Sequence, residues 1–306
     1  MTEPLVIGVD AGGTKTSAWI APLRSEADNI PLGRGQGGPG NPQALGFKNA
    51  FQEIECAIRE AMAAADDSIC RVERLCICAA GAGRAPDQIR IREWAEQKGF
   101  AQQVRVATDA EAVLAAASPE SVGVILICGT GSLAWGRNAA GETYRAGGWG
   151  YLIGDEGSAW AIAMAGLRAA ARAADRRGPQ STLLAELTTA LQLDDASGLI
   201  EYVYGESNSR ARLAGLAGHV FACAAGNDPV ATEIVDRAAQ ELAVMIDTVA
   251  TRLQLPSETA LGLTGGVIIN QHDFRRRVLR FLQHRIQHVH LVTEPVSGAV
   301  TLARTS

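Results

Sequence analysis

The sequence predicts an α/β protein made of two related lobes, and three observations support this. The chain has 306 residues, of which 47% are hydrophobic and 20% charged, enough for two domains with a core each. Apolar strand-like runs alternate with amphipathic helical stretches, as in α/β domains. A strand, a glycine turn and a second strand open the chain and recur after residue 121. We therefore place one lobe at residues 1–117 plus 296–306, and the other at residues 118–295.

The first lobe is expected to begin with two strands joined by a tight glycine turn. A possible third strand and a turn rich in glycine and proline follow. The spacing of three and four between Phe47, Phe51, Ile54 and Ile58 then indicates a helix. In chain order, the expected strands cover residues 5–10, 14–21, 30–36, 72–79 and 104–107, and the expected helices cover residues 47–65, 86–98 and 110–117.

The second lobe is expected to follow a linker at Ser118 to Ser121. It repeats the strand, glycine turn and strand, and it becomes mostly helical beyond Asp155. An apolar stripe opposed by charged residues predicts a long helix packed on the core. The stripe consists of Val230, Ile234, Ala238, Leu242, Met245, Val249 and Leu253. A last strand at 260–264 and a closing helix at 295–303 complete the prediction.

The charge and the cysteines exclude several classes of protein. Lys and Arg total 28 against 33 Asp and Glu, without a long basic block, so no nucleic-acid partner is expected. The apolar runs are too short to span a bilayer, and we expect no membrane association and a cytoplasmic location. The six cysteines are scattered, which favours reduced thiols. Cys76 and Cys78 share one face of an expected strand, but no second pair of ligands completes a metal site.

Glycines and hydrogen-bonding side chains follow the first strand. Asp10 at the strand end precedes Gly12, Gly13, Thr14 and Lys15. Glycines permit a close approach of the backbone to phosphate, and the hydroxyl, ammonium and amide groups bind its oxygens. An acid beside such a loop suits Mg²⁺, which prefers oxygen ligands. The run predicts phosphate binding, although an ordinary hairpin turn is an equal alternative on local sequence.

A second loop of the same kind follows the first strand of the second lobe and comprises Gly129, Thr130, Gly131 and Ser132. Two such loops in equivalent positions favour a nucleotide site over two unrelated hairpins. Neither loop has the P-loop pattern, and neither leads into a helix as the dinucleotide fingerprint requires. The sequence therefore disfavours both of those nucleotide-binding folds.

Asp109 lies at the end of an expected strand, where open α/β folds place functional groups. A carboxylate there can accept the proton of an attacking hydroxyl and orient it, which phosphoryl transfer needs. The alternative is that Asp109 caps the helix beginning at Ala110. Local sequence alone favours the cap.

The stretch from Gly147 to Ser158 is the most unusual in the chain, with five glycines around two aromatic and two acidic residues. Carbohydrate sites combine apolar faces for the ring with carboxylates for its hydroxyls. Asn41, in the earlier turn of glycine and proline, offers an amide with both donor and acceptor groups. The alternative is a buried Trp149 with Asp155 capping the next helix.

Taken in order, these segments resemble the actin, Hsp70 and sugar-kinase superfamily, and within it the N-acetylglucosamine kinase family, which is grouped with the BadF/BadG/BcrA/BcrD ATPases. The resemblance covers nearly the whole chain and rests on VDAGGTKT, GPGN, ATDA, ICGTGS, GGWGYLIGDEGSAW, RLAGLA and LTGG. It implies two ribonuclease-H-like (actin-like ATPase) lobes with an interdomain cleft that closes on ATP and sugar. It also implies a homodimeric, Mg²⁺-dependent kinase whose expected substrate is an amino sugar, N-acetylglucosamine at its 6-hydroxyl.

The resemblance also implies roles for individual residues. Thr14 and Thr130 match the family's ATP-contacting threonines, and Asp10 matches its Mg²⁺-associated acid. Asp109 matches the family's catalytic base, which reverses the local preference for a cap. The family's sugar contacts fall on Asn41, Asp109, Gly148, Trp149, Gly150 and Asp155, and its nucleotide-side segments on Ala214, Gly265 and Gly266.

Three alternatives stay open at this stage. The acceptor sugar is glucosamine or N-acetylmuramic acid in place of N-acetylglucosamine. An ATPase that activates 2-hydroxyacyl-CoA dehydratases belongs to the same grouping, but it should carry cysteine ligands for an iron–sulfur cluster and a GGQD-like second loop. A sugar-responsive regulator is the non-enzymatic alternative. Such regulators usually carry a DNA-binding helix-turn-helix before the kinase-like part, and here the first expected strand begins close to Met1.

Overall fold

The computed structural model describes residues 3–24, 30–205 and 209–305. It divides into two compact units, which we name unit 1 (residues 1–122 and 292–306) and unit 2 (residues 123–291). Each unit is an α/β structure around one sheet of five strands. Across the described ranges, no helix is both long enough and apolar enough for a transmembrane span.

The sheet of unit 1 has the strand order β3-β2-β1-β4-β5. β1, β2 and β3 form an antiparallel meander, and β4 and β5 run parallel to β1. The predicted hairpin around the first glycine turn is confirmed as the β1–β2 pair. The strands cover Leu5–Ala11 (β1), Thr16–Pro22 (β2), Gly33–Gly37 (β3), Val72–Ala79 (β4) and Ala101–Thr108 (β5).

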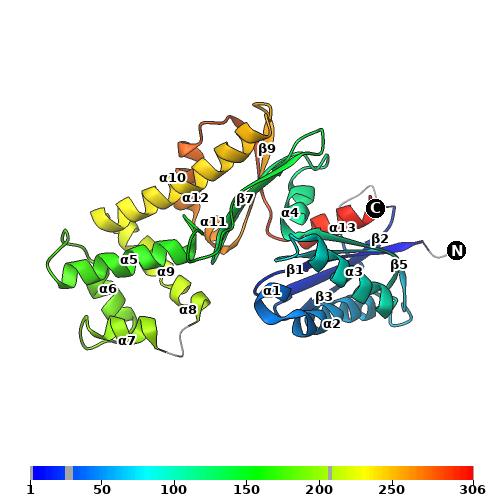
Figure 1. Cartoon of the computed structure of the whole chain (residues 1–306), viewed down its shortest axis with the longest axis horizontal. Helices are drawn as coiled ribbons and strands as arrows, with labels where there is room; N and C mark the ends of the chain where they lie inside the picture. Colours follow the sequence, from blue (N-terminus) through cyan, green and yellow to red (C-terminus); the bar gives the residue numbers. More distant parts are fainter. Residues whose placement is uncertain (1–2, 25–29, 206–208, 306) are drawn as a thin grey trace. The chain divides into compact units, whose positions relative to one another are not determined.

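Helices cover both faces of this sheet (Figure 1). Alternate residues of β1 point to opposite faces, so Ile7 packs in the core with α2 and α3, while Val6 packs in the core with α4 and α13. Because both faces of the sheet are covered, the central strands β1 and β4 read as nearly continuous apolar runs. The helices cover Pro42–Leu45 (α1), Phe47–Ala65 (α2), Ala85–Lys98 (α3), Asp109–Ala117 (α4) and Val296–Arg304 (α13).

The glycines of β3 let helix α2 lie directly against the sheet. A Cβ atom at Gly33 or Gly35 would overlap the carbonyl oxygen of Ala61 or Ala57 on α2. Small residues on both elements therefore bring the two backbones close together. The glycine-rich run at the third strand is thus a packing surface for the helix.

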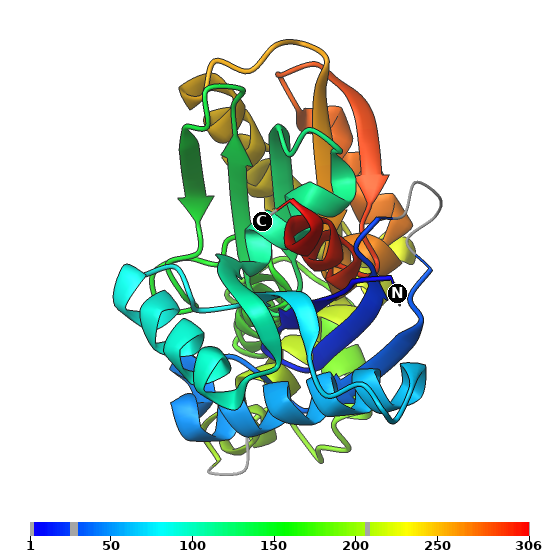
Figure 2. The ribbon, with the colours of Figure 1, turned by 90° about the vertical axis from the view of Figure 1, so that its right-hand side faces the viewer.

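Unit 2 has the strand order β10-β9-β6-β7-β8, which repeats the topology of unit 1 (Figure 2). β6, β7 and β8 are antiparallel, and β9 and β10 run parallel to β6. The predicted recurrence of strand, glycine turn and strand is confirmed by the β6–β7 hairpin. The strands cover Gly123–Cys128 (β6), Ser132–Arg137 (β7), Thr143–Gly147 (β8), Thr259–Thr264 (β9) and Ile286–Leu291 (β10).

Two strands of unit 2 were not predicted, and the expectation that residues 260–264 form the last strand is wrong. β8 and β10 are the edge strands of the sheet, and most of their residues are exposed. β10 carries His288 and His290 among its few apolar residues. An exposed edge strand needs little apolar sequence, so the hydrophobic pattern gives only a weak signal.

The rest of unit 2 is helical, as predicted. The long stripe helix is confirmed as α10, with Leu242, Met245 and Val249 buried. Besides α10, the helices cover Ala159–Ala174 (α5), Leu183–Ala190 (α6), Gly198–Tyr204 (α7), Arg210–Gly215 (α8), Ala217–Ala225 (α9), Gly266–Asn270 (α11) and His272–Phe281 (α12), while α10 itself covers Pro229–Arg252.

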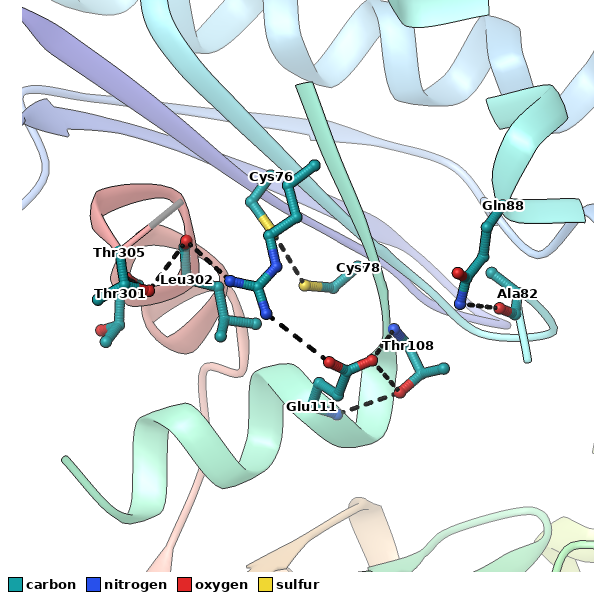
Figure 3. Close-up of polar contacts among 10 residues, drawn as sticks. Cys76, Cys78, Ala82, Gln88, Thr108, Glu111, Thr301, Leu302 and Thr305 are labelled. Atoms are coloured by element: carbon teal, nitrogen blue, oxygen red, sulfur yellow. Dashed lines mark hydrogen bonds and ion pairs between the residues drawn. The ribbon is translucent and has the colours of Figure 1, made fainter. Parts of the chain in front are cut away.

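All six cysteines are unpaired thiols. Cys76 and Cys78 on β4 are buried with their sulfur atoms 3.7 Å apart (Figure 3). In the part of the chain that the structure describes, no cluster of three or more His, Cys, Asp or Glu residues is arranged to hold a metal ion.

Candidate functional site

Asp10 and Asp109 lie at the same edge of the unit 1 sheet. Asp10 is paired in register with Cys78 of β4, and Cys78 is paired with Ala107 of β5. Asp109 follows Thr108, the last residue of β5. The carboxyl ends of the parallel strands β1, β4 and β5 therefore present two acids close together, at the edge where α/β sheets bind ligands.

The surroundings raise the pKa of both acids. Burial and, as a smaller cause, the charge of Asp109 raise the pKa of Asp10 to about 7, and Lys15 opposes the shift. Burial also raises the pKa of Asp109, while hydrogen bonds from the backbone N–H groups of Ala110 and of Asp109 itself oppose the shift. A carboxylate with a raised pKa is a better proton acceptor than an ordinary aspartate.

The amino end of α4 is capped by Thr108, not by Asp109. The Thr108 hydroxyl accepts a hydrogen bond from the N–H of Glu111 at 3.3 Å, and the Glu111 carboxylate accepts one from the N–H of Thr108 at 3.0 Å (Figure 3). This reciprocal capping box satisfies the helix start. The alternative that Asp109 is the cap is therefore wrong, and the carboxylate of Asp109 is available at the first helical position.

The first glycine loop is fixed by its backbone and open on its side-chain surface. The N–H of Gly12 donates to the carbonyl of Lys15, and the N–H of Gly40 donates to the carbonyl of Gly12, both at 2.9 Å. A Cβ atom at Gly13 would meet no atom within 4 Å, and Thr14 and Lys15 are exposed. Packing does not require a glycine at position 13, which leaves room for a ligand to approach the backbone.

Asn41 uses its acceptor oxygen within the protein. Its Oδ1 caps α1 by accepting hydrogen bonds from the N–H groups of Gln43 at 2.9 Å and Ala44 at 3.4 Å. The expectation that Asn41 offers a free donor and a free acceptor is therefore corrected. Its amide nitrogen provides the donors that can reach a ligand. The bond between Gly40 and Gly12 fixes this turn beside the first loop.

In unit 2, the second glycine loop is interlocked with the segment from Gly147 to Ser158. The hydroxyl of Ser132 donates to the carbonyl of Glu156 at 2.6 Å, and the N–H of Gly148 donates to the carbonyl of Ser132 at 3.1 Å. The N–H of Ala159 donates to the carbonyl of Gly129 at 2.9 Å. The structure thus brings two of the predicted site segments into direct contact.

Asp155 is the charged centre of this segment. It is buried, its φ of 61° lies in the left-handed region, and its Oδ1 accepts a hydrogen bond from the N–H of Ser132 at 3.2 Å. Its Oδ2 forms an ion pair with Arg210. Ser158 caps α5, so the alternative that Asp155 is the helix cap is wrong. A buried carboxylate in a strained conformation is a common feature of functional sites.

Trp149 is exposed, which overturns the alternative of a buried tryptophan. Its side chain has a relative exposure of 66%, and the guanidinium of Arg145 lies 5.3 Å from its ring centroid. The glycines on both sides, Gly148 and Gly150, have φ angles of 69° and 86°. These left-handed positions, which glycine adopts without strain, make the sharp turn that exposes the indole.

Of the segments assigned to the nucleotide, the Gly265–Gly266 pair adjoins the second loop, and Ala214 lies on a separate helix. Gly265 has a φ of 102° and precedes α11. A Cβ atom on Gly129 would lie 3.7 Å from the backbone nitrogen of Gly266, so the Gly265–Gly266 pair adjoins the loop. Ala214 is buried on α8, the helix that Arg210 opens.

Arg210 was missed by the sequence reasoning. Besides its ion pair with Asp155, its Nη2 donates to the carbonyl of Thr130 at 3.5 Å. The one available signal was its place just before the RLAGLA motif. No local pattern distinguishes it from Arg212.

Comparisons with known proteins show the family to which the chain belongs. A model of the BadF/BadG/BcrA/BcrD ATPase family matches residues 7–303. The chain is similar to the N-acetylmuramic acid/N-acetylglucosamine kinase of Clostridium acetobutylicum, with 30% identity covering 98% of both chains. It is similar to the N-acetyl-D-glucosamine kinase of Dictyostelium discoideum, with 29% identity covering 100% of this chain and 99% of the other. In fold it is similar to a crystal structure from Chromobacterium violaceum titled a putative N-acetylglucosamine kinase, with a TM-score of 0.76, 23% identity and coverage of 98% and 99%.

Proposed function

Because the chain belongs to the BadF/BadG/BcrA/BcrD ATPase family, we propose that it is an ATP-dependent kinase that phosphorylates N-acetylglucosamine at the 6-hydroxyl. Both whole-length relatives are named as kinases of this sugar. One of them also carries N-acetylmuramic acid in its name, so this sugar is the second candidate substrate. It shares the N-acetyl group and the 6-hydroxyl of the first.

The observation that carries the proposal is the placement of Asp109. Its carboxylate lies at the carboxyl end of a parallel strand and is not needed as a helix cap. Its raised pKa strengthens it as an acceptor for the proton of an attacking hydroxyl. In the proposed reaction, Asp109 orients the sugar hydroxyl and accepts its proton while the γ-phosphoryl group is transferred from ATP.

The two glycine loops are proposed to bind ATP. In unit 1, Gly12 closes the loop with its own N–H, and Gly13, Thr14 and Lys15 provide backbone N–H groups, a hydroxyl and an ammonium group. Gly129, Thr130, Gly131 and Ser132 in unit 2 form the second loop, which offers the hydroxyl of Thr130 and the N–H of Gly131, while the donors of Gly129 and Ser132 shape the loop. Ala214, Gly265 and Gly266 complete the proposed nucleotide-binding set. Thr14 and Thr130 are exposed, which supports hydrogen bonds from their hydroxyls to phosphate oxygens.

The donors around Asp10 fit a magnesium ion. Mg²⁺ is commonly bound through one or two carboxylates together with substrate phosphates and water. Asp10 and Asp109 are two carboxylates that repel each other, and a cation between or beside them would relieve this repulsion. Bound Mg²⁺ would neutralise charge on the phosphates of ATP. Asp10 is the residue proposed to hold it.

The sugar contacts that we propose from the family resemblance are Asn41, Asp109, Gly148, Trp149, Gly150 and Asp155. The exposed indole of Trp149 offers an apolar face for the pyranose ring. The free amide donors of Asn41 suit an acceptor such as the N-acetyl carbonyl or a ring hydroxyl. We also propose a cytoplasmic location and a homodimer, which the unpaired cysteines and the family resemblance support.

The test is an ADP-release assay with purified protein, Mg²⁺ and ATP. The panel contains N-acetylglucosamine, N-acetylmuramic acid, glucosamine and glucose, with EDTA in a parallel series. We expect release that depends on sugar and metal, is greatest with N-acetylglucosamine, and falls at least a thousandfold in Asp109→Asn. Mass spectrometry of the product and loss of activity with a 6-deoxy sugar identify the hydroxyl.

A matched control is Asp67→Asn, at an exposed acid after α2. It should keep wild-type activity. ADP release that no sugar stimulates would reject the sugar-kinase proposal in favour of the dehydratase-activating ATPase or the sensor. A preference for N-acetylmuramic acid would transfer the proposal to the second candidate.

A further inference from the structure

Arg210 contacts both functional segments of unit 2. Its Nη2 forms an ion pair with Asp155, in the proposed sugar segment, and donates at 3.5 Å to the carbonyl of Thr130, in the proposed nucleotide loop. We propose that Arg210 is a positioning residue that couples the binding of ATP to the binding of the amino sugar. This inference rests on the function proposed above, because it assigns Asp155 to the sugar and Thr130 to the nucleotide.

The position of Asp155 depends on Arg210 for an electrostatic reason. The Asp155 side chain is only 6% exposed, whereas that of Arg210 is 37% exposed. A carboxylate that is removed from water requires a charge partner and hydrogen bonds. Arg210 supplies the charge, and the N–H of Ser132 supplies a hydrogen bond at 3.2 Å. Without Arg210, this carboxylate would lose its charge partner and would turn toward water.

The second glycine loop is shaped to admit this ion pair. A Cβ atom on Gly131 would lie 2.8 Å from Nη2 of Arg210 and 2.8 Å from Oδ1 of Asp155, so a larger residue would displace the pair. The guanidinium carbon of Arg210 also lies 5.1 Å from the ring centroid of Tyr151. Tyr151 in turn packs edge to face against Trp160, with their ring centroids 5.0 Å apart. The guanidinium thus contacts both the loop and the aromatic part of the sugar segment.

One donor of Arg210 has no acceptor in this arrangement. Its Nε is buried without a hydrogen-bond partner among the described residues. A buried donor left unpaired is costly, so the observed position is not the best that a guanidinium with five donors can reach. A ligand oxygen, or a turn of Asp155 on sugar binding, would supply the missing acceptor. Either change would also alter the contact with Thr130.

The two binding events are therefore linked through one side chain. A sugar that hydrogen-bonds to the Asp155 carboxylate changes the contact between Arg210 and the loop. A nucleotide that binds the loop changes the ion pair between Arg210 and Asp155. Such linkage is reciprocal, because each ligand must alter the affinity of the other by the same factor. It favours turnover when both substrates are bound and limits transfer of the phosphoryl group to water.

The test measures the Kd of N-acetylglucosamine by calorimetry, with and without a non-hydrolysable ATP analogue and Mg²⁺. In the wild-type protein, we expect the analogue to tighten sugar binding about 5- to 150-fold, the usual range of coupling between two sites. In Arg210→Ala, this factor should fall to about one. In Arg210→Lys, which keeps the charge but loses the planar fork, it should be intermediate. Circular dichroism and melting curves report whether each variant folds.

The matched control is Arg212→Ala on the same helix. The Arg212 guanidinium lies 5.0 Å over the ring of Tyr202 and is exposed, so its removal should leave the coupling factor unchanged. The double variant Arg210→Ala with Asp155→Asn should lose no more coupling than either single variant, because both act through one contact.

Wild-type coupling in Arg210→Ala, or additive losses in the double variant, would overturn the inference and leave the kinase proposal intact. If Arg210→Ala does not fold, wild-type coupling in Arg210→Lys would overturn it equally. A wild-type protein that binds the ATP analogue but none of the amino sugars would contradict both the kinase proposal and the coupling.

Discussion

Thr108 and Glu111 cap the start of α4 reciprocally, and Asp109 lies between them without taking part in the capping box. In this position its carboxylate accepts a hydrogen bond from the adjacent N–H of Ala110 at 3.0 Å. The capping box fixes the direction of the helix start, and the helix start fixes Asp109 at the end of β5. A structural residue pair thus determines the geometry of the proposed catalytic base.

Replacing Thr108 by alanine should therefore reduce both stability and turnover. Loss of the cap should cost about 1 kcal/mol of unfolding free energy. Because Asp109 would lose its fixed orientation, kcat should fall about tenfold while the KM for ATP changes little. Urea unfolding and steady-state kinetics measure the two effects. Thr108→Ser keeps the hydroxyl and should restore both, and an unchanged kcat in Thr108→Ala would contradict the positioning role.

Asp10→Asn should stabilise the metal-free protein at high pH. The folded-state pKa of Asp10 is about 7, above its ordinary value of 3.8, so the folded chain binds this proton more tightly than the unfolded chain. The wild-type protein should consequently gain stability as the pH falls through about 7 toward 3.8. The neutral amide removes this dependence, and at pH 8 it should raise the free energy of unfolding by about 1 to 3 kcal/mol.

The measurement for Asp10 is a series of chemical unfolding curves in EDTA between pH 5 and pH 8. The difference in free energy of unfolding between Asp10→Asn and the wild-type protein should decrease as the pH decreases. Asp67→Asn, at an exposed acid after α2, is the control and should follow the wild-type curve. If the free energy of unfolding has the same pH dependence in Asp10→Asn and in the wild-type protein, Asp10 does not have the raised pKa.

The sequence predicted the fold well because most of the elements are buried. The predicted bounds of β4 and α2 agree with the structure at both ends, since apolar residues on both faces of β4 and a 3.6-residue period in α2 give a strong signal. The edge strands β8 and β10 were missed because they bury little. Sequence reasoning alone also favoured the wrong residue as the cap of α4.

Residues of the candidate site could be predicted only where they belong to a local sequence motif. Glycine runs and acids at strand ends are visible in sequence, whereas contacts between distant residues are not. Arg210 meets Asp155 across 55 positions of chain, and no spacing rule relates them. The helix cap at Asn41, by contrast, has a local signal, because Asn41 before Pro42 is a typical helix start.

Gly13→Ala should separate ligand binding from folding. The added Cβ atom meets nothing within 4 Å, so the free energy of unfolding should change by no more than about 0.5 kcal/mol. If phosphate approaches this backbone, the methyl group should raise the KM for ATP about tenfold. Gly218→Ala, an exposed position on α9 where the added atom also meets nothing, is the matched control. An unchanged KM for ATP in Gly13→Ala would exclude close phosphate contact there.

The thiols should fall into two classes of reactivity. Cys56 and Cys70 are exposed, whereas the other four cysteines are buried. The pKa of Cys78 is raised by its hydrogen bond with Cys76 and by burial, and burial raises the pKa of Cys128 as well. Since the thiolate is the reactive form, a disulfide reagent should modify two thiols quickly and all six after unfolding in guanidinium. Rapid modification of Cys76 or Cys78 in the native protein, identified by peptide mass spectrometry, would contradict the buried pair.

Trp149→Ala should weaken sugar binding without affecting the fold. The indole is 66% exposed, so its removal sacrifices little packing, and the melting temperature should stay within about 2 °C of the wild-type value. If the ring stacks on the sugar, the KM for N-acetylglucosamine should rise about tenfold, equivalent to about 1.4 kcal/mol, with the KM for ATP unchanged. Trp149→Phe, which keeps an aromatic face, should recover most of the affinity.

Tyr204→Ala is the matched control for Trp149, because Tyr204 is an aromatic residue of the same unit with an exposure of 83% and no assigned role. Its removal should leave the KM values for both substrates unchanged. Equal effects of the two alanine variants on the KM for the sugar would mean that the effect of Trp149→Ala is not specific to the sugar site. A normal sugar KM in Trp149→Ala would remove this side chain from the sugar site and leave Asp155 to define the sugar contacts of unit 2.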